Sequence, residues 1–121
     1  MPIDLHTHSS ASDGTQAPAD LVRDAAACGI AVLGLTDHDT TAGWSEAAQA
    51  ASECGIALVR GAELSTRTGS TSVHLLSYLH DPDDAALDAA LTRSRTARVR
   101  RAEAIVTRLA RDFSLTWEDV Q

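Results

Sequence analysis

Two histidines near the start of the chain, His6 and His8, stand one residue apart, and an aspartate, Asp13, follows them. If this stretch is a β-strand, side chains two positions apart share one face, with Cα atoms about 6.5 Å apart. Both imidazole rings can then reach one ion. Mixed histidine and carboxylate ligands suit zinc, manganese or iron better than calcium or magnesium. The same pair can also arise by chance in a surface loop, so the rest of the chain must decide.

Further candidate ligands stand where strands are expected to end or begin. His38 follows an apolar run and is flanked by Asp37 and Asp39, Glu63 ends the next run, and His74 opens a third. Taken singly, each has an ordinary explanation as a solvated carboxylate or as a core histidine with satisfied hydrogen bonds. They form a site only if the fold brings these strand ends to one rim.

The first strand–helix unit is predicted from residues 3–6, an apolar strand start. Pro18 suits the first turn of a helix, and Gly29 suits the position just after its end. Residues 30–35 then form a nearly continuous apolar run, which is typical of a parallel strand buried on both faces.

A second unit repeats the first. We expect a helix at about residues 42–53, with one of the polar residues 39–41 as its cap, and then a strand over residues 56–64. The tetrapeptide Cys-Gly-Ile-Ala occurs at both Cys28 and Cys54. Neither cysteine lies in a metal-binding Cys-x-x-Cys pattern, so we interpret both as buried thiols in a reducing compartment.

The third connection does not repeat the strand–helix unit. Too few residues separate residues 56–64 from the next apolar run for a crossover to a parallel strand. We therefore predict a hairpin, with an antiparallel strand over residues 73–79. Residues 83–112 are predicted to be helical, with a break allowed at residues 96–98. The chain thus divides into metal-site strand–helix units over about residues 1–80 and a helical segment over about residues 83–112.

Composition sets the class of protein. A chain of 121 residues has room for one domain, and its formal net charge of −7 argues against a broad basic surface for nucleic acid or membranes. The N-terminus shows no signal-peptide pattern, and no apolar run reaches the roughly 20 residues of a membrane span. We expect a cytoplasmic protein that makes no membrane contact.

Arginines are concentrated in the predicted last helix, at positions 93, 95, 98, 100 and 101. Arginine binds phosphate through two hydrogen bonds, so these side chains are candidates for holding a phosphorylated substrate. At helical spacing they spread around much of the circumference, which is equally typical of a solvated face. If any of them bind substrate, we expect Arg93 and Arg98.

The segments IDLHTHSSASDGT, GLTDHDT, GAELS and VHLLSY, in this order, resemble the N-terminal part of the polymerase-and-histidinol-phosphatase (PHP) superfamily. They look most like its stand-alone metal-dependent phosphoesterases. The resemblance implies an α/β fold, a distorted (β/α)7 barrel, of which about the first half is present as roughly four strands plus helices. It also implies two or three divalent metal ions (Mn, Fe or Zn). The implied reaction is hydrolysis of phosphate esters, in the closest subgroup nucleotides or RNA ends, by a metal-activated hydroxide.

The same resemblance assigns roles to individual residues. Six become metal ligands in three groups: His6 and His8 on one ion, Glu63 bridging that ion to a second held also by His74, and Asp13 and His38 on a third. Asp37 and Asp39 belong to the motifs and are expected to orient imidazoles through hydrogen bonds. The general acid is not assigned by the resemblance.

The family pattern also contains a later histidine and a C-terminal Asp-x-His, and no histidine follows His80 here. We therefore expect a truncated chain whose open sheet is covered by a homodimer partner or by a missing C-terminal half. The alternatives to an enzyme are a noncatalytic metal-binding or interaction module and an inactive fragment. A polymerase editing domain is a third alternative, although no polymerase sequence is present. His80 itself is expected to be exposed.

Overall fold

The computed structural model describes residues 1–120 and contains four strands and three helices. In chain order they are β1 (Ile3–Thr7), α1 (Pro18–Ala27), β2 (Val32–Leu35), α2 (Trp44–Cys54), β3 (Ala57–Thr68), β4 (Thr71–Tyr78) and α3 (Ala85–Leu109). This order confirms the predicted α/β class and the repeated strand–helix units.

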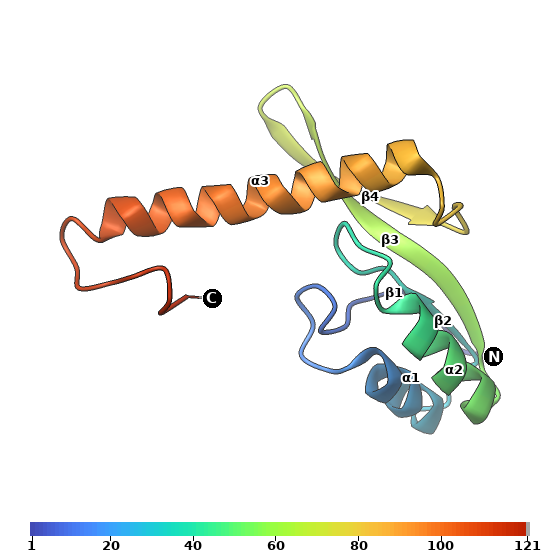
Figure 1. Ribbon diagram of the computed structural model, residues 1–121. Coiled ribbons are helices and arrows are strands. Elements are labelled where there is room, and N and C mark those ends of the chain that lie inside the picture. Colours follow the sequence, from blue (N-terminus) through green and yellow to red (C-terminus); the bar gives the residue numbers. More distant parts are fainter. Residues whose placement is uncertain (121) are drawn as a thin grey trace.

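The four strands form one sheet in the order β1-β2-β3-β4 (Figure 1). Strands β1, β2 and β3 are parallel, and β4 runs antiparallel to β3, which confirms the predicted hairpin. The sheet is curled, since the hydroxyl of Tyr78 on β4 donates to the carbonyl of Leu5 on β1 over 2.8 Å. A curled four-stranded sheet of this kind corresponds to about half of a barrel.

The core lies between the sheet and the pair of helices α1 and α2, which pack side by side (Figure 1). Val22, Leu33 and Leu35 are almost completely buried there, together with the small alanines of α2. Trp44 opens α2, and its indole N–H donates to the carbonyl of Gly61 over 2.9 Å. The two helices are thereby fixed to the strands whose ends carry the candidate site.

Helix ends follow the sequence in part. Gly29 and Gly55 adopt φ values of 81° and 70° after α1 and α2, the left-handed conformation that ends a helix at low cost. The predicted cap of α2 is wrong. That helix begins after Gly43 without a side-chain cap. The Asp39 carboxylate accepts from the backbone N–H of Ser65, and the Thr40 hydroxyl accepts from the N–H of Ala42, before the helix begins.

Several boundaries differ from the sequence prediction. Strand β3 continues to Thr68, so Glu63 lies within the strand, at the point where pairing with the chain after β2 ends and the hairpin continues. Helix α3 has no break, and Asp84 caps it by accepting from the N–H of Leu87. Figure 1 shows α3 crossing the β3–β4 hairpin at the end of the molecule away from α1 and α2.

Three predictions about exposure are corrected. Cys28 and Cys54 are free thiols, but both are exposed because each lies at the end of a surface helix. His80 is partly buried against the ring of Trp44, with 5.0 Å between ring centroids. Burial lowers the pKa of His80, since a charged imidazole loses hydration there.

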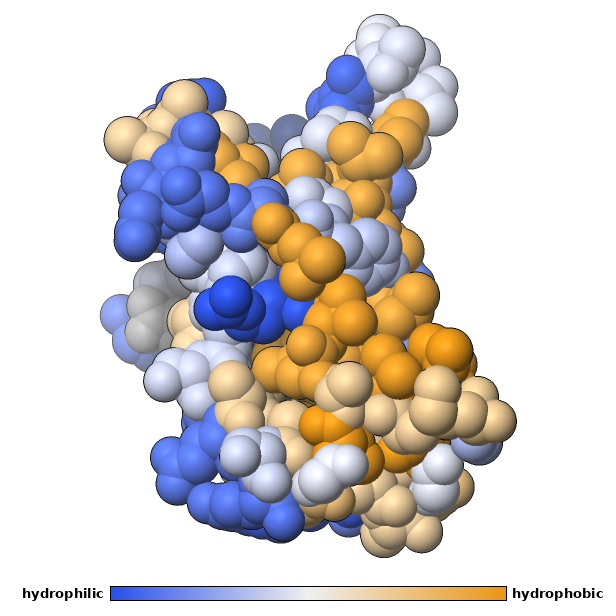
Figure 2. All heavy atoms as spheres, turned by 90° about the vertical axis from the view of Figure 1, so that its right-hand side faces the viewer, coloured by the Kyte–Doolittle hydropathy of each residue, from blue (hydrophilic) through white to orange (hydrophobic). Residues whose placement is uncertain are grey.

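Part of the surface is apolar. Figure 2 shows a broad hydrophobic area over the side of the molecule that lies on the right of Figure 1. Among the large apolar side chains that the strands leave exposed are Ile3, Leu5, Val73 and Leu75. Within residues 1–120, no helix combines the length and apolar character needed to cross a bilayer.

Candidate metal centre

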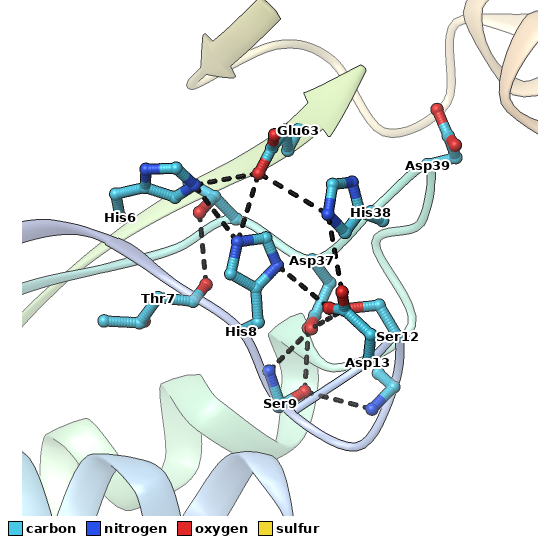
Figure 3. A network of polar contacts seen from close by, with 12 residues as sticks. His6, Thr7, His8, Ser9, Ser12, Asp13, Asp37, His38, Asp39 and Glu63 are labelled. Carbon is cyan, nitrogen blue, oxygen red and sulfur yellow. Dashed lines mark hydrogen bonds and ion pairs between the residues drawn. The ribbon is translucent and has the colours of Figure 1, made fainter. Parts of the chain in front are cut away.

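The parallel strands deliver the candidate ligands to one rim of the sheet. His6 lies on β1 and His8 just after it, His38 follows β2, and Glu63 on β3 pairs with His38 through a parallel bridge. On β4, His74 pairs in register with the residue two positions after Glu63. Figure 3 shows the side chains from β1, β2 and β3 directed toward one another. The structure therefore brings together all six residues that the sequence singled out, Asp13 included.

Glu63 is the centre of this group. Its Oε2 atom lies 2.8 Å from Nε2 of His6 and 3.1 Å from Nε2 of His8. Its Oε1 atom lies 2.5 Å from Nδ1 of His74. The side chain is only 7% exposed, so its two oxygens face different imidazoles inside a sheltered rim.

The pKa of Glu63 reflects this environment. Burial raises the pKa of the carboxyl, but hydrogen bonds with His6 and His74 and the nearby charge of His38 lower it below its ordinary value of 4.5. Glu63 is therefore ionised at neutral pH and can bind a cation without first losing a proton.

Three overlapping groups of donor atoms each lie within 4.8 Å of one another. They are His6, His8 and Glu63; His8, Asp13 and His38; and His38, Glu63 and His74. The His8 ring faces two groups, because its Nδ1 lies 3.5 Å from Oδ1 of Asp13 while its Nε2 faces Glu63. Nε2 of His38 lies 3.6 Å from Oδ2 of Asp13 and 3.7 Å from Oε2 of Glu63.

The donor set fits divalent metal ions. Among the described residues, three buried ring nitrogens make no hydrogen bond, namely Nδ1 of His8, Nδ1 of His38 and Nε2 of His80, which is costly for a polar atom. Of these, Nδ1 of His8 faces Asp13 within a donor group. Nε2 of His6 and Nε2 of His8 lie only 3.1 Å apart, so at most one of the two can carry a proton toward the other. Imidazole nitrogens gathered beside carboxylate oxygens are the mixed donor set that suits a zinc, manganese or iron ion.

Asp37 supports the loop between His8 and Asp13. This almost fully buried carboxylate accepts from the N–H of Ser9 over 2.7 Å and from the hydroxyls of Ser9 and Ser12 over 2.8 and 2.7 Å. The expectation that Asp37 orients an imidazole is therefore corrected. Asp37 bonds to Ser9 and Ser12 of the loop, and the loop in turn positions His8 and Asp13.

Asp39 is corrected in the same way. Its carboxylate accepts from the N–H of Ser65 over 2.8 Å and from the guanidinium of Arg98 over 2.7 Å, rather than from an imidazole. Asp39 thus joins the end of β2 to β3 and to α3.

A groove of about 720 Å³ opens beside the donor groups, between α3 and the β3–β4 hairpin. It is lined by Asp13, His38, Ser65, Thr66, Arg67, Ser72, His74, Arg93, Ser94, Ala97, Arg98 and Arg101. Both arginines expected to bind substrate are in this wall. Arg101, one of the five arginines noted in the sequence, also lines the groove, whereas the sequence analysis missed Arg67, which lies on β3.

Comparison with known families identifies the fold. Residues 4–111 match the family model described as PHP domain. The chain belongs to the PHP domain family. It is 45% identical over 100 residues to a 3′,5′-nucleoside bisphosphate phosphatase of Chromobacterium violaceum, covering 83% of this chain and 35% of that protein. It is 42% identical over 106 residues to a 5′-3′ exoribonuclease of Haemophilus influenzae, covering 88% and 39% respectively.

Solved structures agree with this assignment of the PHP domain. A protein of Bifidobacterium adolescentis described as a candidate metal-dependent phosphoesterase superposes with a TM-score of 0.92 at 40% identity, covering 99% of this chain and 42% of that one.

A DNA polymerase is also similar in sequence. An error-prone DNA polymerase of Mycobacterium tuberculosis is 47% identical over 89 residues, which cover 66% of this chain and 8% of the polymerase. The chain thus spans between a third and two fifths of the phosphatase and exoribonuclease relatives.

Proposed function

We propose that this PHP chain supplies the greater part of a metal centre that hydrolyses phosphate esters. The observation that carries the proposal is the position of Glu63, whose two carboxylate oxygens face imidazoles on opposite sides. A carboxylate held in this way suits a bridge between two cations, as in the two-metal sites of phosphatases and nucleases.

The donor groups suggest how the ions are distributed. We assign His6, His8 and one oxygen of Glu63 to the first ion, and the other oxygen of Glu63 with His74 to the second. Asp13 and His38 are assigned to a third. His8 is given to the first ion because its Nε2 is 3.1 Å from Glu63, whereas its Nδ1 is 3.5 Å from Asp13. Held in this way, the first ion would have three ligands from this chain, and the second and third ions would have two each.

When bound, such ions act as Lewis acids on phosphoryl oxygens and lower the pKa of water to about 7 in favourable cases. The protein's own contribution is to hold the substrate. The groove beside the centre has the size of a small-ligand site, and arginines on its wall can pair with phosphate oxygens. We assign phosphate binding first to Arg93, because the guanidinium of Arg98 already bonds to Asp39 and Ser65.

A nucleotide or an RNA end is the substrate that we propose. Relatives named nucleoside bisphosphate phosphatase and 5′-3′ exoribonuclease support this choice. The groove arginines are consistent with it, since both substrates carry terminal phosphate groups. The identity of the ions, among Mn, Fe and Zn, and a cytoplasmic location stay predictions.

The test separates metal binding from hydrolysis. Metal content per chain is measured by elemental analysis after purification without chelator, and hydrolysis of a 3′,5′-nucleoside bisphosphate and of a 5′-phosphorylated RNA is then assayed. We expect two or more ions per chain and activity that His8→Ala abolishes. The control is His80→Gln, which removes a histidine outside the donor groups. Near-zero metal in the unaltered chain would refute the proposal.

A noncatalytic metal-binding module is the second candidate, and it is the conclusion if the ions bind without hydrolysis. The share of the relatives that the chain covers keeps this candidate open. Two partners stay predictions: a second copy of this chain, forming a homodimer, and a polypeptide equivalent to the rest of the relatives' barrel. The apolar surface in Figure 2 is where either would bury area.

A further inference from the structure

We propose that Arg95 and Arg98 of α3 are positioning residues of the metal centre, acting through Asp39 to hold His38 beside Glu63. The inference rests on the proposed metal centre, and it gives helix α3 a part in positioning the ligands.

Asp39 lies immediately after a candidate ligand in an unusual conformation. Its φ is 53°, in the left-handed region, which a non-glycine residue occupies only when its surroundings hold it there. Its backbone N–H donates to the carbonyl of Glu63 over 3.0 Å, and the N–H of Glu63 donates to the carbonyl of Asp37 over 3.1 Å. His38 is therefore pinned on both sides to the backbone of Glu63.

Every polar group of Asp39 is in use. One carboxylate oxygen accepts from the N–H of Ser65 and the other from Arg98, whose guanidinium also donates to the Ser65 hydroxyl over 3.0 Å. The carbonyl of Asp39 accepts from the guanidinium of Arg95. Asp39 is 1% exposed, so removing Arg98 would leave a buried carboxylate without its cation, a costly arrangement.

The geometry links a helix to the site. Arg95 and Arg98 are one helical turn apart on α3 and meet Asp39 from the same side, so they act as a pair. Asp39 transmits their position to His38 through one peptide bond, and to Glu63 through Ser65 and the backbone bond. The docking of α3 on the hairpin thereby sets the spacing between these two ligands.

The experiment uses Co²⁺ as the probe, since its visible spectrum reports coordination geometry. We expect Arg98→Met to weaken Co²⁺ binding by about 10- to 100-fold, the usual effect of losing a residue that orients ligands, and to change the spectrum. Arg98→Lys keeps the charge without the planar two-partner contact, so it should restore part of the affinity. Arg100→Met, an exposed arginine on the same helix, is the matched control and should match the unaltered chain.

A second measurement needs no metal. Hydrogen exchange in the metal-free chain follows the Ser65 amide, which bonds to Asp39, and we expect Arg98→Met to reduce its protection while Arg100→Met leaves it unchanged. Asp39→Asn combined with Arg98→Met should weaken Co²⁺ binding no more than the stronger single change. Unchanged Co²⁺ affinity and Ser65 protection in Arg98→Met would overturn the positioning role alone. No Co²⁺ binding by the unaltered chain would overturn the proposed metal centre, and with it any role in positioning one.

Discussion

Gly34 on β2 offers a way to move the candidate ligands without touching them. A Cβ atom at this position would lie 2.6 Å from the carbonyl oxygen of Leu5 and 2.7 Å from its Cα, whereas ordinary contacts begin at 3.4 Å. Gly34→Ala should therefore push β1 away from β2 by about 0.8 Å, because close-packed backbone has no room to absorb the clash. His6 and His8 would move with β1.

The size of this shift decides the expected effect. Metal–ligand distances tolerate about 0.2 Å, so the movement should weaken Mn²⁺ binding by about 10-fold or more, comparable to losing a residue that orients a ligand. The overpacking should also cost about 1–3 kcal/mol of unfolding free energy. Mn²⁺ titration by calorimetry and urea unfolding followed by circular dichroism measure the two effects.

Gly55→Ala provides the matched control. Gly55 has nothing within 4 Å of its added Cβ, but its φ is +70°, so alanine is strained there by about 1–2 kcal/mol. The two variants should lose similar stability, while only Gly34→Ala loses metal affinity. Equal Mn²⁺ affinity in the two variants would refute the reasoning that β1 spacing controls the site.

Three other changes test separate parts of the structure. Glu63→Gln should weaken metal binding by about 100-fold and lower the metal content, because this carboxylate belongs to two of the three donor groups. Elemental analysis measures the metal content, and Glu53→Gln, at an exposed position, is the control. Burial lowers the pKa of His80 from 6.5, so the metal-free chain should lose stability as pH falls below about 6.5, and His80→Gln should flatten that part of the pH profile in urea unfolding. Trp44→Phe should cost about 1 kcal/mol, since the buried carbonyl of Gly61 loses its donor; urea unfolding measures this change.

Each of these expectations has a clear contrary result. Full metal content in Glu63→Gln would show that the carboxylate is not a bridge. An identical pH profile in His80→Gln would mean that another group causes the loss of stability in mild acid. An unchanged free energy of unfolding in Trp44→Phe would mean that the hydrogen bond from the indole N–H adds nothing to stability, and that Trp44 contributes only through its packing.

Local patterns were enough to predict the element order. The apolar run at residues 30–35, the glycines at 29 and 55, and the short connection before residue 73 gave two strand–helix units and a hairpin, all of which the structure contains. The candidate ligands were also visible in the sequence, because four of its five histidines fall at predicted strand ends, beside carboxylates.

Contacts between distant residues were not visible. Asp37 and Asp39 share a motif with His38, so an imidazole partner was expected for both, yet they bond to residues 25 to 59 positions away. The exposure of Cys28 and Cys54 and the partial burial of His80 also depend on neighbours that are distant in sequence.

The sequence by itself therefore determined the fold class, the order of the elements and the set of donor residues, because these follow from periodicity, turn residues and residue type. Only the tertiary structure decided that the two oxygens of Glu63 face different imidazoles, that β3 continues past it, and that α3 reaches the site through Arg95 and Arg98. The physical reason is that hydrogen-bond partners across a curled sheet are chosen by strand register and helix docking, which sum many weak contacts along the whole chain.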